Sequence, residues 1–394
     1  MSSRTVFKFI NHASILATHG QHSLLTDPWY ASNAFGSWYQ NPPPRTEDIV
    51  ELINSDQQIG VLVSHGHDDH LDEWFVTHHL NSLPFFIPTY PSPGLETRLK
   101  LKLGLETRPI GEKSSFGPFA LRQFINHNFT GNDAVITIEY NNKLVIHAND
   151  NWHEWPDKMI QEMIPVLSCY TQKDIFFLVQ FGIADCFPIN YPKISTNDAR
   201  TIISNRFLSY KSAIIKNLGR LEINNCFLYA NQSQFDYTNN EIRLILDNVK
   251  DDFQQDDRFN QLTPGDSVCE DHSIKGASVK NSDFFYFRLK ALENFINIKF
   301  RLETSTKFVP LTLACESDEV TIEPNGITYV ANRSTWNLIL TGELTLESII
   351  IGGSGLIYTN NENIREHHMF MSKTCYIIQN KIKSDGIYFF LANS

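Results

Sequence analysis

The chain has 394 residues, of which 42% are hydrophobic and 20% are charged, as in a folded globular protein with more than one domain. Its net charge of −11 argues against a general surface for nucleic acid or anionic membranes. The sequence shows no signal-peptide core, no apolar run long enough to span a bilayer and no Cys-x-x-Cys pair among its six cysteines. We therefore expect a cytoplasmic protein with reduced thiols that binds neither nucleic acid nor membrane.

The first 240 residues alternate between strand-like and helix-like patterns. Runs rich in β-branched and apolar residues predict strands, and segments with helical spacing of apolar residues lie between them. This interleaving predicts sheets flanked by helices. The strand-like runs are 5–10, 13–20, 22–30, 59–63, 84–90, 119–126, 134–140, 143–150, 173–182 and 224–233, and the helical segments are 46–55, 73–83, 94–104 and 198–219.

The composition changes after residue 240. An acidic connector at 247–261 leads into a region that is mainly strand-like from residue 283 onward. We predict a domain boundary at residue 245. Residues 246–394 would form a smaller α+β, mainly antiparallel accessory domain.

One short loop in the first half of the chain carries a dense cluster of histidine and aspartate residues. The apolar strand at 59–63 leads directly to His65, His67, Asp69 and His70. Imidazoles two residues apart project the same way from an extended backbone, so His65 and His67 can hold one divalent ion. Asp69 and His70 follow the bend and can face a second ion. Mixed imidazole and carboxylate donors suit zinc, iron or manganese and not calcium.

This loop matches the His-x-His-x-Asp-His signature of the metallo-β-lactamase superfamily, and the resemblance extends from residue 5 to about residue 240. It implies an α/β sandwich with αββα layers and with the metal ions at one edge of the two sheets. Residues 1–245 would then be the metal-binding catalytic domain.

The resemblance also implies ligands from later loops. His127 would complete a three-histidine set with the first two histidines of the motif. Asp150 would bridge to the second ion, which Asp69 and His70 hold. Asp69 and Asp150 would be the catalytic carboxylates of this pair of ions.

One position of the superfamily pattern has no match. Members usually supply a last histidine to the second metal, but the corresponding stretch 227–240 contains none. Asp236 or Tyr237 falls near the expected place. An oxygen donor there would favour iron or manganese over two zinc ions. The alternative is a single strongly bound metal.

Four side chains are expected to surround the metal ligands. His12 and Asp27 lie on the first strands, His153 follows Asp150 closely, and Tyr237 falls near the second ion. Asp27 could accept a hydrogen bond from a ligand histidine and fix its tautomer.

Three segments carry a second, narrower resemblance. Residues 24–44, 177–192 and 262–268 resemble CMP-N-acetylneuraminate hydroxylases and related sugar-nucleotide hydroxylases, and diiron monooxygenases with a metallo-β-lactamase fold are similar. This resemblance implies a non-heme diiron enzyme that hydroxylates a small molecule. The Rieske cluster of the sugar hydroxylases needs Cys-x-His, which is absent here, so electrons would come from a separate ferredoxin or reductase.

Two other functions stay open from the sequence. One is a di-zinc hydrolase of the same fold, of the lactonase or phosphodiesterase type. The other is a metal-bearing binding or scaffold protein. Iron in the purified protein would favour the oxygenase, and two zinc ions would favour the hydrolase.

Overall fold

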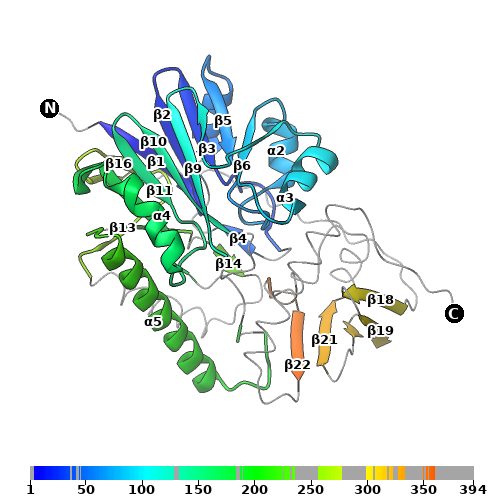
Figure 1. Ribbon diagram of the computed structural model, residues 1–394. Helices are drawn as coiled ribbons and strands as arrows, with labels where there is room; N and C mark the ends of the chain where they lie inside the picture. Colours follow the sequence, from blue (N-terminus) through cyan, green and yellow to red (C-terminus); the bar gives the residue numbers. More distant parts are fainter. Residues whose placement is uncertain are drawn as a thin grey trace.

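Two large mixed sheets dominate the computed structural model (Figure 1). Smaller sheets of two and five strands lie beyond them. The structure describes residues 4–35, 38–40, 44, 46–127, 133–182, 187–188, 190–224, 226–230, 233–235, 256–276, 299–304, 307–316, 319–322, 327–332, 349, 352–353 and 355–359.

The first sheet has eight strands in the order β17-β16-β1-β2-β3-β5-β6-β7. Neighbours are antiparallel from β17 to β3 and parallel from β3 to β7. Thr26 pairs with Leu62, so the carboxyl ends of β3 and β5 lie side by side. The strands are β1 (Thr5–Asn11), β2 (Ser14–His19), β3 (His22–Thr26), β5 (Gln58–Leu62), β6 (Phe85–Ile87), β7 (Thr107–Pro109), β16 (Ser267–Cys269) and β17 (Ile274–Lys275).

The second sheet has seven strands in the order β15-β13-β12-β11-β10-β9-β8. It is antiparallel from β8 to β11 and parallel from β11 to β15. The strands are β8 (Ser114–Phe116), β9 (Phe119–Ile125), β10 (Ala134–Tyr140), β11 (Lys143–His147), β12 (Ile175–Gln180), β13 (Cys226–Tyr229) and β15 (Phe259–Gln261).

Helices cover the outer face of each sheet. The first sheet is covered by α1 (Thr46–Ile53), α2 (Glu73–His79), α3 (Gly94–Thr97) and the π-helix η1 (Arg98–Lys102). The second sheet is covered by α4 (Asp157–Leu167) and α5 (Thr196–Arg220). A 3-10 turn, η2 (Gln172–Asp174), precedes β12. In the part of the chain that the structure describes, none of the helices combines the length and apolarity needed to span a membrane.

Among the described residues, three hydrophobic clusters fill the space between the layers. Phe7 of β1 packs edge-on against Phe176 of β12 and Phe227 of β13, with ring centroids 6.3 and 6.2 Å apart, in the core between the sheets. On β12 the neighbouring Phe177 faces the opposite way, into the core beneath α4 and α5. Every residue of β12 is buried, which explains its continuous apolar sequence. The predicted αββα sandwich is confirmed.

The sandwich continues past residue 245. Strand β15 joins the second sheet and β16 and β17 join the first, so by sheet membership the sandwich reaches Lys275. The predicted boundary therefore does not coincide with the end of these sheets. The acidic composition of 247–261 does not reveal this continuation, because β15 lies at the end of that connector and two more short strands follow it.

A mainly antiparallel C-terminal region is also confirmed. Five antiparallel strands form the order β18-β19-β20-β21-β22. Ile357 of β22 donates its backbone N–H to Asn190 O at 2.8 Å, which joins this sheet to the segment before α5. The strands are β18 (Lys299–Thr304), β19 (Lys307–Glu316), β20 (Glu319–Ile322), β21 (Ile327–Asn332) and β22 (Gly355–Thr359), and the two-stranded sheet pairs β4 (Trp38–Gln40) with β14 (Ser233–Phe235).

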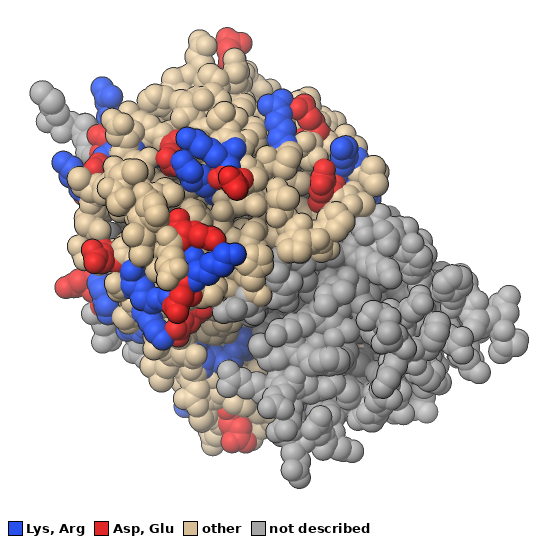
Figure 2. Space-filling view, in the orientation of Figure 1, with Lys and Arg blue, Asp and Glu red and all other residues tan. Residues whose placement is uncertain are grey.

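Figure 2 shows how charge is distributed over one face of the sandwich. Lysine and arginine side chains alternate with aspartate and glutamate side chains over the described residues of this face. Oppositely charged side chains also form ion pairs in the structure, as between Lys216 and Glu154 at 2.5 Å and between Arg122 and Glu139 at 2.7 Å.

Candidate metal centre

The loop after β5 is held in place by its last residue. Asp72 caps α2 by accepting a hydrogen bond from Phe75 N at 2.9 Å. Its other carboxylate oxygen accepts hydrogen bonds from Ala31 N at 2.7 Å and Ser32 N at 2.8 Å. The loop between β5 and α2 is therefore tied to the loop after β3.

A buried arginine also holds this loop in place. Arg98, at the start of η1, is 2% exposed and donates to the carbonyl of Gly66. It also pairs with Glu73 at 2.5 Å and with Asp68 at 3.3 Å. A side chain of η1 thus holds the backbone of the loop around His67 in place.

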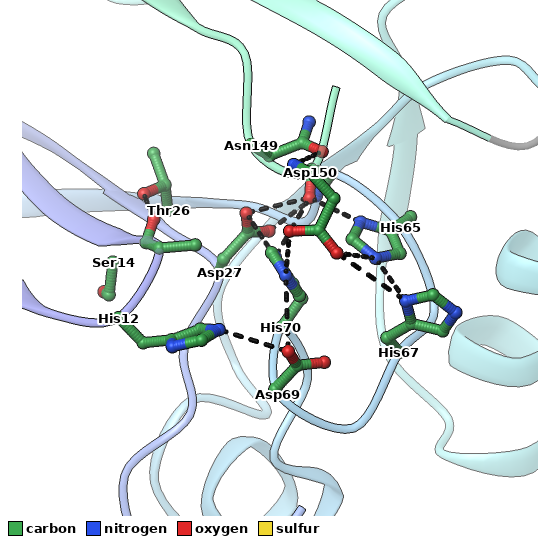
Figure 3. Close-up of polar contacts among 12 residues, drawn as sticks. His12, Ser14, Thr26, Asp27, His65, His67, Asp69, His70, Asn149 and Asp150 are labelled. Carbon is green, nitrogen blue, oxygen red and sulfur yellow. Dashed lines mark hydrogen bonds and ion pairs between the residues drawn. The ribbon is translucent and has the colours of Figure 1, made fainter. Parts of the chain in front are cut away.

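The first group of candidate ligands consists of His65, His67 and Asp150. The donor atoms of the group lie within 4.8 Å of one another. His65 Nε2 is 2.8 Å from His67 Nδ1 and 3.5 Å from Asp150 Oδ2 (Figure 3). Burial, together with the charges of His70 and His67, lowers the pKa of His65 to about 4. His65 is therefore neutral near pH 7, as a metal ligand must be.

The second group consists of His12, Asp69 and His70, all buried. His12 Nε2 lies 3.1 Å from Asp69 Oδ2, and His70 Nε2 lies 3.8 Å from the same oxygen. Asp69 Oδ1 is buried and has no hydrogen-bond partner among the described residues. A buried carboxylate oxygen without a partner is costly, and a cation at this position would satisfy it.

Asp150 belongs to the first group and also contacts the second. Its Oδ1 is 3.1 Å from His70 Nε2, while its Oδ2 faces His65 and His67 (Figure 3). Burial disfavours the charge of Asp150, but His70 and the hydrogen bonds from the three histidines outweigh it and hold the pKa well below its usual value. One carboxylate can thus contact an ion in each group. Nitrogen and oxygen donors of this kind fit zinc, iron or manganese.

The structure brings some predicted residues together and leaves others outside. Within the described residues, His127 is exposed in the turn after β9 and belongs to neither group. His153 is half-buried, and its ring lies against that of Trp152 at an interplanar angle of 36°, with centroids 3.5 Å apart. Asp236 and Tyr237 lie outside the described residues. His12 was expected beside the ligands, and it lies within the second group itself.

The sequence interpretation missed three buried residues near the ligands. His147 ends β11 and lies 2.8 Å from both Asp27 Oδ2 and Tyr229 OH. Asp133 is buried, and burial and the charge of Asp150 raise its pKa to about 8. A histidine in the apolar run "KLVIHAND" was a usable signal, whereas Tyr229 in "CFLYA" resembles an ordinary core residue.

Metal binding is expected to release a proton from His70. Burial disfavours its charge, but the carboxylates of Asp150, Asp69 and Asp27 together hold the pKa of His70 well above its usual value. In the metal-free protein His70 is therefore protonated at neutral pH, and an ion at Nε2 must displace about one proton. The apparent affinity should rise with pH until the raised pKa is passed.

Calorimetric titration with metal in buffers of different ionisation enthalpy measures this release. A binding enthalpy that does not depend on the buffer would contradict it. Because the pKa of His65 is lowered, protons should compete with the metal for this side chain only below about pH 4.

No family model matches the sequence, and no curated protein matches it. Solved structures do match, at low similarity. A possible metal-dependent hydrolase from Veillonella parvula is 13% identical, with 68% of this chain and 100% of that chain covered and a TM-score of 0.43. An isothiocyanate hydrolase from Delia radicum gut bacteria is 11% identical, with 67% and 98% covered and a TM-score of 0.41.

A third match is CmlA, a diiron β-hydroxylase from Streptomyces venezuelae. It is 14% identical, with 68% of this chain and 55% of that chain covered and a TM-score of 0.40. Members of the metallo-β-lactamase superfamily are also among the matching structures. At these identities and TM-scores the activities belong to those proteins alone.

Proposed function

We propose that the chain is a dinuclear metalloenzyme, a non-heme iron oxygenase that hydroxylates a small molecule. One observation carries this proposal: each group contains two imidazoles and one carboxylate. Two histidines and one carboxylate on one face of an ion are the ligand set of non-heme iron oxygenases, which leaves open positions for dioxygen and substrate. The side chain of Asp150, with an oxygen toward each group, would join the two ions.

The residues have distinct roles in this proposal. His12 and His70 hold one ion with Asp69, and His65 and His67 hold the other with Asp150. Iron held by these residues would supply the activation of dioxygen. One oxygen atom enters a C–H bond of the substrate as a hydroxyl group, and the other leaves as water with two protons. Two electrons are needed, so we propose a separate ferredoxin or reductase as donor.

Metal content and oxygen uptake test the proposal together. The protein is purified, stripped of metal and reloaded with Fe²⁺ or Zn²⁺ in parallel, and metal per chain is measured. The proposal expects two iron ions per chain and dioxygen consumption by the reduced iron form when substrate candidates are added. Iron-loaded protein that consumes no dioxygen with any electron donor would contradict it.

A zinc hydrolase is the second candidate, because two histidines and one carboxylate also form catalytic zinc sites with an open position for water. Zinc would supply hydroxide near neutral pH. Hydrolysis of ester, lactone and phosphodiester substrates by the zinc form is measured beside oxygen uptake. Zinc-dependent hydrolysis without oxygen consumption would select this candidate and reject the oxygenase.

A further inference from the structure

We propose that Tyr229 and His147 are positioning residues that act through Asp27 to decide which nitrogen His70 offers to a metal ion. The inference rests on the proposed function only in assuming that an ion binds at His70. It adds a fixed direction to a chain of buried hydrogen bonds behind the ligands.

This chain of hydrogen bonds runs between the two sheets. Tyr229, the last residue of β13, lies 2.8 Å from His147 Nδ1, and His147 Nε2 lies 2.8 Å from Asp27 Oδ2. Asp27 Oδ2 in turn lies 3.1 Å from His70 Nδ1. All four residues are at most 1% exposed, so water does not compete for these hydrogen bonds.

A single backbone group sets the direction of these hydrogen bonds. The N–H of Asn149 donates to Tyr229 OH at 2.9 Å, and a backbone N–H can only donate. Asn149 has a positive φ of 41°, a conformation that asparagine tolerates better than most residues, and the turn points its N–H at the phenol. Tyr229 therefore accepts from Asn149 and directs its own proton toward His147 Nδ1.

The remaining protons then have only one arrangement. Since His147 Nδ1 accepts, the neutral ring carries its proton on Nε2 and donates to Asp27. An ionised carboxylate only accepts, so His70 must donate from Nδ1. That leaves Nε2 of His70, which faces Asp150 and the second group, as the nitrogen that can bind an ion once its proton has been released. Burial raises the pKa of Tyr229 well above its usual value, so the phenol keeps the proton that starts the chain.

Asp27 orients a second ligand through Ser64. Ser64 Oγ donates to Asp27 Oδ2 at 2.8 Å, and Ser64 N donates to Oδ1 at 2.7 Å. With its proton used in this way, Ser64 Oγ can accept from His65 Nδ1, 3.0 Å away. His65 then also presents Nε2, the nitrogen 3.5 Å from Asp150. One carboxylate thus sets the tautomer of a ligand in each group.

The tautomer of His147 tests the inference in the unmodified protein. Nitrogen-15 correlation spectra of the zinc-loaded protein are expected to show protons on Nε2 of His147 and Nδ1 of His70. The expected tautomer of His147 can also be checked in the metal-free protein, because His147 is not a ligand. A proton on Nδ1 of His147 would overturn the inference, whether or not metal binds.

Three variants test the effect on metal affinity. Tyr229→Phe and His147→Leu should each lower the affinity for the second ion about 10–100-fold, as loss of an outer partner of a ligand does. His147→Gln keeps a donor toward Asp27 and an acceptor toward Tyr229, so its affinity should stay close to that of the unmodified protein. Competition with a chelating dye measures these affinities, and the melting temperature shows whether each variant is folded.

Tyr140→Phe is the matched control. Tyr140 is also buried in the second sheet and donates to the carbonyl of Val6, away from the ligands. It should lose some stability and no metal affinity. If Tyr229→Phe behaves like Tyr140→Phe, the positioning role is wrong. If the unmodified protein binds no ion while His147 shows the expected tautomer, the proposed function fails and the hydrogen-bond chain stands.

Discussion

Replacement of Asp150 by alanine is expected to remove both ions from the protein. Its Oδ1 faces His70 at 3.1 Å, and its Oδ2 faces His65 at 3.5 Å. Loss of this side chain leaves each group with one oxygen donor fewer, and the first group keeps imidazoles alone. The fall in affinity should exceed the about 10–100-fold that loss of an outer partner costs.

Metal per chain after dialysis against a weak chelator measures this effect. His127→Ala is the control, because His127 is an exposed histidine outside both groups. We expect His127→Ala to retain the metal content of the unmodified protein. If Asp150→Ala keeps two ions, or if His127→Ala loses one, the two groups described here do not hold the metal.

Replacement of Arg98 by methionine is expected to destabilise the fold by about 3 kcal/mol. The change removes a buried charge that pairs with Glu73 and Asp68 and leaves the carbonyl of Gly66 without its donor. Both carboxylates remain partly exposed, at 28% and 24%, so water offsets part of the loss. The loop that carries His65 and His67 should loosen, and metal affinity should fall with stability.

Urea unfolding of the metal-free variant separates the stability effect from metal binding. Lys102→Met is the matched control, since Lys102 pairs with the same Glu73 at 2.9 Å but is 42% exposed. Lys102→Met should lower the free energy of unfolding by less than about 1 kcal/mol, as is usual for loss of a surface ion pair. Equal destabilisation by the two variants would show that Arg98 has no special role beneath the loop.

The local part of the site could be predicted because its residues are close in the sequence. His65, His67, Asp69 and His70 follow one buried strand, and Asp150 follows another. Strand ends and polar clusters are visible in sequence patterns, and so is the alternation that gives the sandwich. These patterns do not show which loops meet in space.

The remaining residues depend on how the sheets pack. His12 reaches Asp69 because β1 and the loop after β5 end at the same edge of the first sheet, and no spacing encodes that contact. His127 also follows a strand, yet its side chain is exposed. Tyr229 and His147 lie on different strands of the second sheet, and only the fold makes them neighbours. Helix α4 was not predicted at all, since Pro165 interrupts its helical pattern.

The hydrogen-bond chain from Tyr229 to His70 also bears on the order in which the protein folds. Its members come from segments far apart in the chain and from both sheets, so it closes only after long stretches have been brought together. Closing such distant contacts is entropically costly and slows folding. We therefore expect this edge to be completed late in folding, and metal ions to bind chains that have already folded.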